Sequence, residues 1–310
     1  MNRSDPFFAL ARRFPALARA CLWLWSRVAL ALGLDIAEKR SWLIDDLADL
    51  VQYRIPVVTK LRNGMSIEVH LTDHVGGAIL RSGYYEPGEV SLVQKLLEPG
   101  MTFLDIGAHV GQYTLVGSER VGAAGEVHAF EPDPETFRWL CSNVERNDLG
   151  NVTTNQLALT AEPGTLQLFE SAVNDVGSTS LREPRQFTGR VHDVACVPLD
   201  DYLRSHGIER VDLIKMDVEG AEISVLQGAK RILSAPDVPI LIVEFEEARQ
   251  RAFGFSCAAL ADELGKYGYA LFIIEEGHLA PHQPRPGLHS YNVMAIPSER
   301  VDQVCASLDA

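Results

Sequence analysis

The sequence predicts an α/β fold whose main sheet has seven mostly parallel strands and an antiparallel last strand, preceded by a cap of helices and a β-hairpin. After residue 100, apolar and β-branched runs alternate with helical patterns, as in sheets whose parallel strands are linked by crossover helices. The last two apolar runs are separated only by the loop "EEGHLAPHQPRPG", so they should pair antiparallel. The 310 residues fit one full-size α/β domain with an appendage, and we expect the cap at residues 1–95 and the main domain at 96–300.

The N-terminal arm, "FFALARRFPALARACLWLWSRVALALGL", is apolar but carries arginines throughout. Arg12, Arg13, Arg19 and Arg27 leave no uncharged run of about 18 to 20 residues, so a membrane-spanning helix is disfavoured, and a signal peptide fits poorly. After Pro15 the pattern is helical, with polar residues grouped on one side. We expect this helix to pack on its own domain or on a twin subunit, as in a homodimer. Contact with a membrane surface is the less favoured alternative.

The rest of the cap follows in order. Residues 40–53 predict a second helix, opened by Ser41 and with acids in its early turns. The segment "PVVTKLRNGMSIEVHL" predicts two strands around Asn63-Gly64, a pair that tolerates the positive φ angles of a tight turn. A short amphipathic helix is expected at 90–97, before Pro99-Gly100.

The main domain contains seven expected strands, with helices in most of the gaps. One gap differs, because residues 160–198 hold two further strand-like runs, "GTLQLF" and "RVHDVACVPL", around a polar loop. The seven strands are expected near residues 101–106, 126–130, 152–158, 211–216, 239–245, 269–274 and 291–296.

Charge and cysteine content limit the partners. Lys and Arg number 28 against 42 Asp and Glu, and the net charge of −14 would repel a nucleic acid. The five cysteines are scattered and odd in number, so neither a zinc knuckle nor a full set of disulfides is indicated. A reducing cytosol, and hence a cytoplasmic protein, is the simplest expectation.

The stretch "MTFLDIGAHVGQYTL" predicts a ligand-binding bend. A strand ends at Asp105 and turns through Gly107 to Gly111 into a helix. This places bare backbone at the carboxyl end of a parallel strand, where doubly wound sheets bind their ligands. Side chains at these two glycines would block close approach by a nucleoside.

A second strand, in "HAFEPDP", ends at Glu131, about 25 residues after Asp105, near the separation at which nucleotide-binding sheets place a ribose-binding acid. A carboxylate there can accept hydrogen bonds from both ribose hydroxyls. Nicotinamide cofactors use the same bend, but their Gly-x-Gly-x-x-Gly pattern is broken by His109. A sulfonium nucleoside lacks phosphates and has less need of a glycine cradle.

The runs "FLDIGAHVGQYTL", "FEPDP", "LDDYL", "DLIKMDVEGAEISVLQGA" and "ILIVEF", over roughly residues 75–296, resemble the FkbM family of S-adenosylmethionine-dependent methyltransferases. The most discriminating piece is "IKMDVEGAE". The resemblance implies a class I methyltransferase fold, which is Rossmann-like, with S-adenosyl-L-methionine as cofactor. It also implies methyl transfer to a hydroxyl of a small molecule, usually a saccharide or a natural product.

The resemblance also implies a set of cofactor-binding residues, namely Asp105, Gly107, Gly111 and Glu131. His109 stands where relatives often have Asn, and it either contacts the cofactor carboxylate or caps the turn.

Asp217 is the best candidate for a catalytic base. It ends the strand "VDLIKMD", which should lie beside the first strand, so its carboxylate is expected at the same sheet edge. An attacking alcohol must lose a proton, and a carboxylate within hydrogen-bond reach can take it or orient the hydroxyl. Glu219 is the second candidate, and purely structural roles are the alternative for both. Glu222 is expected to act only as a helix-dipole partner.

Other residues are weaker candidates. Glu244, at the end of "ILIVEF", is expected to line the acceptor site. Tyr85 and Glu86 in "GYYEPGE" resemble an element that closes over the cofactor, and we expect Tyr85 to contact the substrate and Glu86 the cofactor. We predict no metal site, although Asp217, Glu219 and Glu244 could form a triad if the fold brought them together.

Two other functional classes remain open at this point. One is a nicotinamide-dependent oxidoreductase built on the same bend. The other is a non-catalytic cofactor-binding or assembly module, in which the N-terminal helices recruit partners.

Overall fold

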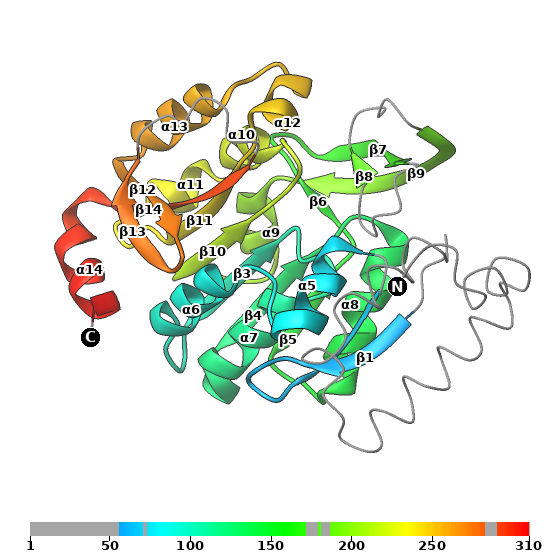
Figure 1. Ribbon diagram of the computed structural model, residues 1–310. Helices are drawn as coiled ribbons and strands as arrows, with labels where there is room; N and C mark the ends of the chain where they lie inside the picture. Colours follow the sequence, from blue (N-terminus) through cyan, green and yellow to red (C-terminus); the bar gives the residue numbers. More distant parts are fainter. Residues whose placement is uncertain (1–55, 71–72, 172–178, 181–186, 283–289, 310) are drawn as a thin grey trace, which may run out of the picture. The chain divides into compact units, whose positions relative to one another are not determined.

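The computed structural model describes residues 56–70, 73–171, 179–180, 187–282 and 290–309 (Figure 1). The expected helices of the arm and of residues 40–53 lie outside this part of the chain. The protein separates into two compact units, residues 1–85 with 171–178 and residues 86–170 with 179–310. The domain division expected at residue 95 stays a prediction.

The described part of the first unit contains the predicted hairpin. Strands β1 (Pro56–Lys60) and β2 (Ser66–His70) pair antiparallel. Only Gly64 of the Asn-Gly pair has a positive φ, +88°. Its N–H donates to the carbonyl oxygen of Leu61 at 2.9 Å, so the turn is longer than a two-residue one.

Helix α5 (His74–Ser82) follows the hairpin in the same unit. It begins after Asp73, whose carboxylate accepts hydrogen bonds from the N–H groups of Val75 and Gly76. An acid at this position satisfies backbone donors that have no partner within a helix.

The second unit is built on an eight-stranded sheet with the order β13-β12-β14-β11-β10-β3-β4-β5 (Figure 1). The five strands from β11 to β5 are parallel, and β14 runs antiparallel to β11 and β12. All seven predicted strands are present, with the antiparallel last strand. The strands are β3 (Thr102–Ile106), β4 (Glu126–Phe130), β5 (Val152–Asn155), β10 (Leu213–Met216), β11 (Ile240–Phe245), β12 (Tyr269–Glu275), β13 (His278–Pro281) and β14 (Tyr291–Pro297).

The eighth strand, β13, lies in the stretch that was expected to be a loop. It pairs antiparallel with β12 through a two-residue turn. Glu276 and Gly277 form this turn with φ angles of +50° and +84°, which match the hairpin turn whose twist fits the flanking strands.

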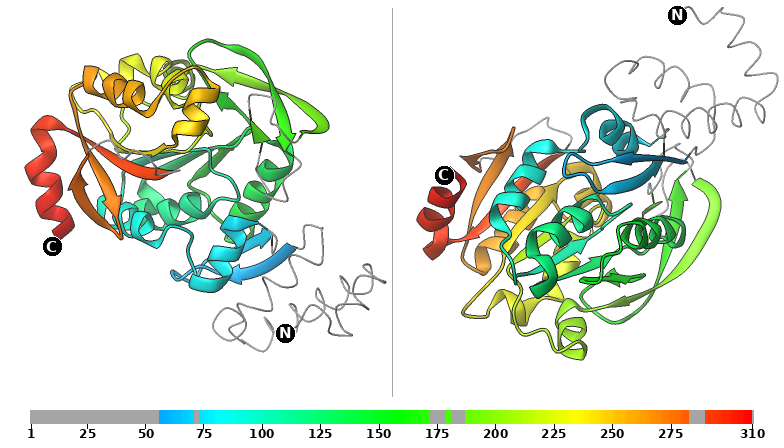
Figure 2. Two further views of the ribbon diagram at one scale, coloured as in Figure 1. Left: turned by 45° about the horizontal axis from the view of Figure 1, so that its top comes forward. Right: turned by 90° about the horizontal axis from the view of Figure 1, so that it is seen from below.

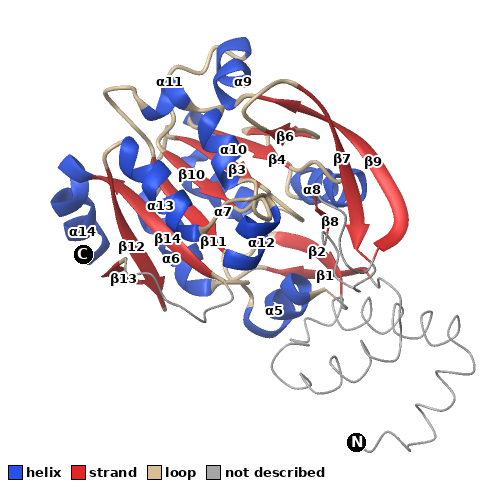
Figure 3. Cartoon of the chain, turned by 90° about the horizontal axis from the view of Figure 1, so that it is seen from above, coloured by secondary structure: helices blue, strands red, loops and turns tan. Residues whose placement is uncertain are grey.

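Helices cover both faces of the sheet. Leu104 and Ile106 point to the face covered by α9, α10, α11 and α13, which is in front in Figure 3. Phe103 points to the opposite face, where its ring lies against Gly117 of α7. Helices α6 to α8 lie in front of the sheet in the right view of Figure 2. The helices are α6 (Pro87–Leu96), α7 (Gln112–Val121), α8 (Pro134–Arg146), α9 (Leu199–Ser205), α10 (Glu222–Gln227), α11 (Lys230–Leu233), α12 (Glu247–Ala252), α13 (Cys257–Lys266) and α14 (Val301–Asp309), with 3₁₀ turns at Gly122–Ala124 and Ser298–Arg300.

A smaller four-stranded sheet has the order β6-β9-β7-β8. Its two long strands, side by side in Figure 3, are the two added strands expected between residues 160 and 198. The strands are β6 (Ala158–Leu159), β7 (Gly164–Ser171), β8 (Thr179–Ser180) and β9 (Phe187–Val197).

The strand order places a switch point at β3. The chain passes from β3 to β4 on one side and later returns to β10 on the other side. Ligands of open α/β sheets bind at the carboxyl ends of strands where the order reverses in this way. The described residues include no helix that is both long enough and apolar enough to span a membrane.

Candidate functional site

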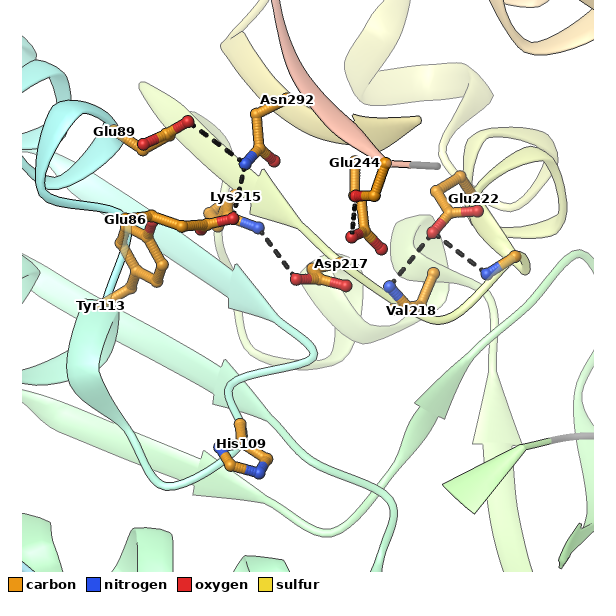
Figure 4. Close-up of polar contacts among 12 residues, drawn as sticks. Glu86, Glu89, His109, Tyr113, Lys215, Asp217, Val218, Glu222, Glu244 and Asn292 are labelled. Atoms are coloured by element: carbon orange, nitrogen blue, oxygen red, sulfur yellow. Dashed lines mark hydrogen bonds and ion pairs between the residues drawn. The ribbon is translucent and has the colours of Figure 1, made fainter. Parts of the chain in front are cut away.

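Strand register gathers polar side chains on one face of the sheet. Lys215 pairs with Asp105, and Glu244 pairs with Asn292. Since successive strand residues point to opposite faces, Asp217 lies on the same face as Lys215. This is the face covered by α7, and Figure 4 shows the resulting cluster.

The glycine bend after β3 is pressed against the chain's own atoms. Gly107 has a φ of +82°, and a Cβ there would overlap the carbonyl oxygen of Asp217. Gly111 has a φ of +94°, and a Cβ there would lie 2.7 Å from Cδ1 of Leu140 in α8. Both glycines are therefore required by internal packing, whereas the sequence suggested space for a ligand as the reason.

Replacing Gly107 with alanine is expected to destabilise the protein by roughly 3 kcal/mol or more, because strain at positive φ adds to the overlap with Asp217. Gly207→Ala is a matched control, since Gly207 has a φ of +68° with open space around its Cβ position. It should cost only about 1 kcal/mol. Urea unfolding of both variants measures the difference, and equal losses would contradict the packing argument.

Glu131 follows β4 and faces the glycine bend. Its Oε2 accepts the N–H of His109 at 2.9 Å, and its Oε1 accepts the N–H of Asp133 at 2.9 Å. The side chain is buried, and burial raises the pKa of Glu131 to about 7. Each oxygen retains a free lone pair, and hydroxyl donors would compensate for the lost hydration. The buried carboxylate therefore fits the two hydroxyls of a ribose.

His109 contacts Glu131 through its backbone. Its φ is +52°, a conformation in which Asn, Asp and His are enriched among residues other than glycine. This backbone requirement favours the turn-capping interpretation of His109, and a contact with a cofactor stays a prediction. In Figure 4 the His109 ring lies apart from Lys215 and Asp217.

Asp105 anchors α7 to the sheet. Its Oδ2 accepts a hydrogen bond from the Thr114 hydroxyl at 2.5 Å, and the side chain is buried. Burial raises the pKa of Asp105 to about 6. Asp105 thus has a structural role in holding α7, and its contact with a cofactor stays a prediction.

Lys215 is at the centre of the cluster and was not predicted from the sequence. It is 2 % exposed, and its Nζ lies 3.3 Å from Oδ2 of Asp217 and 5.3 Å from the centre of the Tyr113 ring. Burial alone would lower the pKa of Lys215, but nearby carboxylates outweigh it and raise the pKa. The available signal was a lysine within the otherwise apolar strand "LIKM".

Glu86 links three elements of the second unit, namely α6, α7 and β14. It stands at the N-cap position of α6 without a side-chain capping bond, its Oε2 accepts a hydrogen bond from the Tyr113 hydroxyl at 2.8 Å, and its Oε1 accepts one from Nδ2 of Asn292 at 2.8 Å. The same Nδ2 lies 3.4 Å from Glu89. Glu86 therefore belongs to the cluster around Lys215, and its cofactor contact stays a prediction.

Tyr85, which was predicted to contact the substrate, is the last residue of the first unit. Its ring lies edge-on to that of His74 at 5.7 Å between ring centres. The predicted contact with a substrate stays a prediction.

Asp217 and Glu244 form a carboxyl pair in which each group shifts the pKa of the other. Burial opposes ionisation of Asp217, but Lys215 and the bond with Glu244 outweigh it and lower the pKa of Asp217. Burial, together with the charge of Asp217, raises the pKa of Glu244 to about 9. At neutral pH the pair therefore carries one proton, on Glu244. The Asp217 side chain is 30 % exposed, so a ligand can reach it.

The carboxylate of Glu219, the second candidate base, points to the guanidinium group of Arg249. Glu219 has a φ of +61° and forms an ion pair with Arg249, which also binds Glu246 at 2.6 Å. Asp217, Glu219 and Glu244 therefore do not converge as a triad. Among the residues that the structure describes, no group of three or more His, Cys, Asp or Glu side chains is placed to hold a metal ion.

Glu222 closes the turn between β10 and α10. Its Oε1 accepts the N–H groups of Val218 at 3.2 Å and Gly220 at 3.3 Å, and its Oε2 accepts Nε2 of Gln250. Burial raises the pKa of Glu222 to about 7. Glu222 thus does more than the helix-dipole contact expected from the sequence.

The raised pKa of Glu222 predicts how the effect of Glu222→Gln on stability depends on pH. A folded-state pKa above the unfolded value stabilises the fold at low pH, and this contribution is lost as pH rises through about 7. Between pH 5 and pH 8 the free energy of unfolding of the wild type should fall by about 2 to 3 kcal/mol relative to that of Glu222→Gln. Urea unfolding at both values measures this, with the exposed Glu275→Gln as control. A constant difference across the range would show that Glu222 ionises normally.

A family model described as "Methyltransferase FkbM domain" matches residues 105–271. Among curated proteins, the chain is 34% identical to "Methyltransferase sdnD" of Sordaria araneosa over 40% of the chain and 59% of that protein. It is 27% identical to "Hexuronic acid methyltransferase AglP" of Haloferax volcanii, over 51% of the chain and 62% of that protein. It is 29% identical to "2-O-methyltransferase NoeI" of Sinorhizobium fredii, over 47% of the chain and 63% of that protein. The chain thus spans about three fifths of the length of these relatives.

Solved structures also resemble the chain. One is described as methyltransferase FkbM from Methylobacillus flagellatus, with a TM-score of 0.42 and 17% sequence identity. The similarity covers 73% of this chain and 61% of that one.

Proposed function

The chain belongs to the FkbM family of methyltransferases, and on this premise we propose that it methylates a hydroxyl oxygen of a small molecule with S-adenosyl-L-methionine as the methyl donor. The acceptor class that we propose is a saccharide or a natural product. Support comes from the relatives whose names specify 2-O-methylation and a hexuronic acid. Family membership argues against the nicotinamide-dependent oxidoreductase.

The observation that carries the proposal is the position of Glu131. Its carboxylate is fixed by the N–H groups of His109 and Asp133 and faces the bend from Gly107 to Gly111. We propose that Glu131 and this bend hold the adenosine part of the donor. When bound, S-adenosylmethionine supplies a methyl group on a positively charged sulfur.

The chain's own contribution to the reaction is alignment and removal of a proton. Asp217 is partly exposed and ionised, so one of its carboxylate oxygens can accept a hydrogen bond from the attacking hydroxyl. Alignment of this kind supplies much of the acceleration in transfer reactions. The same oxygen can take the hydroxyl proton during or after transfer. Glu219 remains the second candidate, and Glu244 is proposed to line the acceptor site.

Mass spectrometry tests the proposal. The protein is incubated with a metabolite pool and with S-adenosylmethionine that carries an isotopically labelled methyl group. We expect a product that retains the label as a methyl ether, and no such product with heat-inactivated protein. Label found only on nitrogen or carbon would contradict hydroxyl methylation.

A further inference from the structure

We propose that Asp217 and Glu244 act as one proton-sharing carboxyl pair, with Lys215 fixing Asp217 as the ionised member, and that Glu244 returns the substrate's proton to solvent beside Ser290. The catalytic part of this inference rests on the proposed function. The pair itself is a property of the protein without any ligand.

Strand register brings the two carboxyl groups together. Met216 of β10 pairs with Val243 of β11, so the next residues, Asp217 and Glu244, are neighbours at the sheet edge. Lys215 pairs with Ile242, and Asp217 and Glu244 each lie two residues further along their own chain segment. Because side chains alternate between the faces of a sheet, both carboxyl groups point to the same face. Each carboxyl group shifts the pKa of the other as a hydrogen-bonding neighbour, and a hydrogen bond between two carboxyl groups requires a proton on one of them.

Lys215 decides which carboxyl group holds the proton. Its Nζ lies 3.3 Å from Asp217, so the ionised form is favoured there. Two adjacent carboxylates cannot both ionise readily, and Glu244 therefore keeps the proton. The pKa of about 9 for Glu244 agrees with this assignment. Other charged groups that act on the pair or on Lys215 include Glu86, Glu89, Asp105, Glu222 and Arg249.

The pair connects the buried lysine to the protein surface. Oε1 of Glu244 accepts a hydrogen bond from the Ser290 hydroxyl at 2.7 Å, and Ser290 is exposed. The contacts therefore run in order from Lys215 through Asp217 and Glu244 to Ser290. A proton placed on Asp217 has a hydrogen-bonded route to water.

An independent observation points to a ligand group at this cluster. Asn292 lies directly opposite Glu244 in β14 and is 5 % exposed. Its Nδ2 donates to Glu86, whereas its buried Oδ1 has no hydrogen-bond partner among the described residues. Figure 4 shows this oxygen on the side that faces Glu244. A buried acceptor of this kind normally finds a donor, and a hydroxyl of the methyl acceptor would supply one.

The protons balance over one turnover. The hydroxyl oxygen bonds to the methyl carbon as the carbon–sulfur bond of the donor breaks, and the electron pair of that bond stays on sulfur. The hydroxyl proton passes to Asp217, so the pair then holds two protons. Glu244 releases its proton to water beside Ser290 and takes up the proton of Asp217, which restores the starting state. Lys215 keeps its proton throughout.

Carboxyl ¹³C NMR of the full chain, with labelled glutamate and no ligand, tests the pair. Between pH 5 and pH 10 we expect one glutamate signal that titrates near pH 9, is absent in Glu244→Gln and remains in Glu275→Gln. Glu275 is a matched control because it is exposed, at the end of the nearby strand β12. In Asp217→Asn the Glu244 midpoint should fall by at least about one pH unit, since the neighbouring charge is gone.

Two results would overturn the pair: titration of Glu244 near the ordinary glutamate value, or no response to Asp217→Asn. Calorimetry with S-adenosylhomocysteine on the same samples separates the two proposals. If S-adenosylhomocysteine binds but the pair is absent, this inference alone is overturned. If the pair is present but S-adenosylhomocysteine does not bind, the proposed function and the proton route that rests on it are overturned, and the pair itself stands.

The proton route has its own test. In the labelled-methyl experiment, Glu244→Gln should form product at least about tenfold more slowly than wild type. Its affinity for S-adenosylhomocysteine should be unchanged. A wild-type rate would remove Glu244 from the route.

Discussion

Replacing Lys215 with methionine is expected to lower the free energy of unfolding by about 3 to 5 kcal/mol, the usual cost of removing one partner from a buried charged group. The substitution keeps the apolar stem but removes the charge that offsets Asp217 and Glu86. These carboxyl groups would then be left without their cation. Urea unfolding at pH 7 measures the change.

The effect of Lys215→Met should depend on pH in a defined direction. The pKa of Asp217 is lowered in the folded protein, so its pairing with Lys215 stabilises the fold above about pH 3.8 and is lost as pH falls further. The cost of the substitution should therefore be smaller at pH 3.5 than at pH 7. Lys230→Met is the control, because Lys230 is exposed, and it should change stability by less than about 0.5 kcal/mol. Equal costs for the two variants would mean that Lys215 does not hold the cluster together.

Replacing Asp217 with asparagine is expected to lower the rate of methyl transfer by about 10²- to 10⁴-fold, the usual range for loss of a general base. Asparagine has nearly the same shape but cannot take the proton. Binding of S-adenosylhomocysteine should be nearly unchanged, since Glu131 and the glycine bend remain. Single-turnover measurement, on an acceptor identified with the labelled donor, separates the rate of transfer from binding.

Glu219→Gln is the matched comparison for Asp217→Asn. Glu219 lies two residues further on but is bound to Arg249, so its loss should slow transfer much less. If Glu219→Gln were the more damaging change, the base would have to be reassigned to Glu219. A wild-type rate in both variants would leave alignment alone as the source of catalysis.

The fold was largely predictable because its signals are local. Apolar runs, crossover spacing and the glycine bend identified all seven expected strands and the antiparallel end of the sheet. Strand β13 was missed because its turn uses Glu276-Gly277, and glutamate rarely takes a positive φ. The arm and the segment at residues 40–53 fall outside the described part of the chain.

The site was predictable only in part. Glu131 and Asp217 stand out because each follows directly after a strand. The cluster of Lys215, Tyr113 and Asn292 depends on which strands are neighbours and in what register, and a single sequence does not contain that information. The contact between Glu219 and Arg249 likewise depends on how α12 packs beside the turn.

The most direct test of the central claim, that Glu131 and the glycine bend bind the methyl donor, is calorimetry with S-adenosylhomocysteine at pH 8. The wild type should bind, and Glu131→Gln should weaken binding by about 10- to 100-fold, because two charge-assisted hydrogen bonds are lost. Glu126→Gln is the control, since Glu126 is exposed at the start of the same strand and should leave binding unchanged. Wild-type binding should also weaken at pH 6, where Glu131 is protonated. Undiminished binding by a folded Glu131→Gln protein would contradict the account.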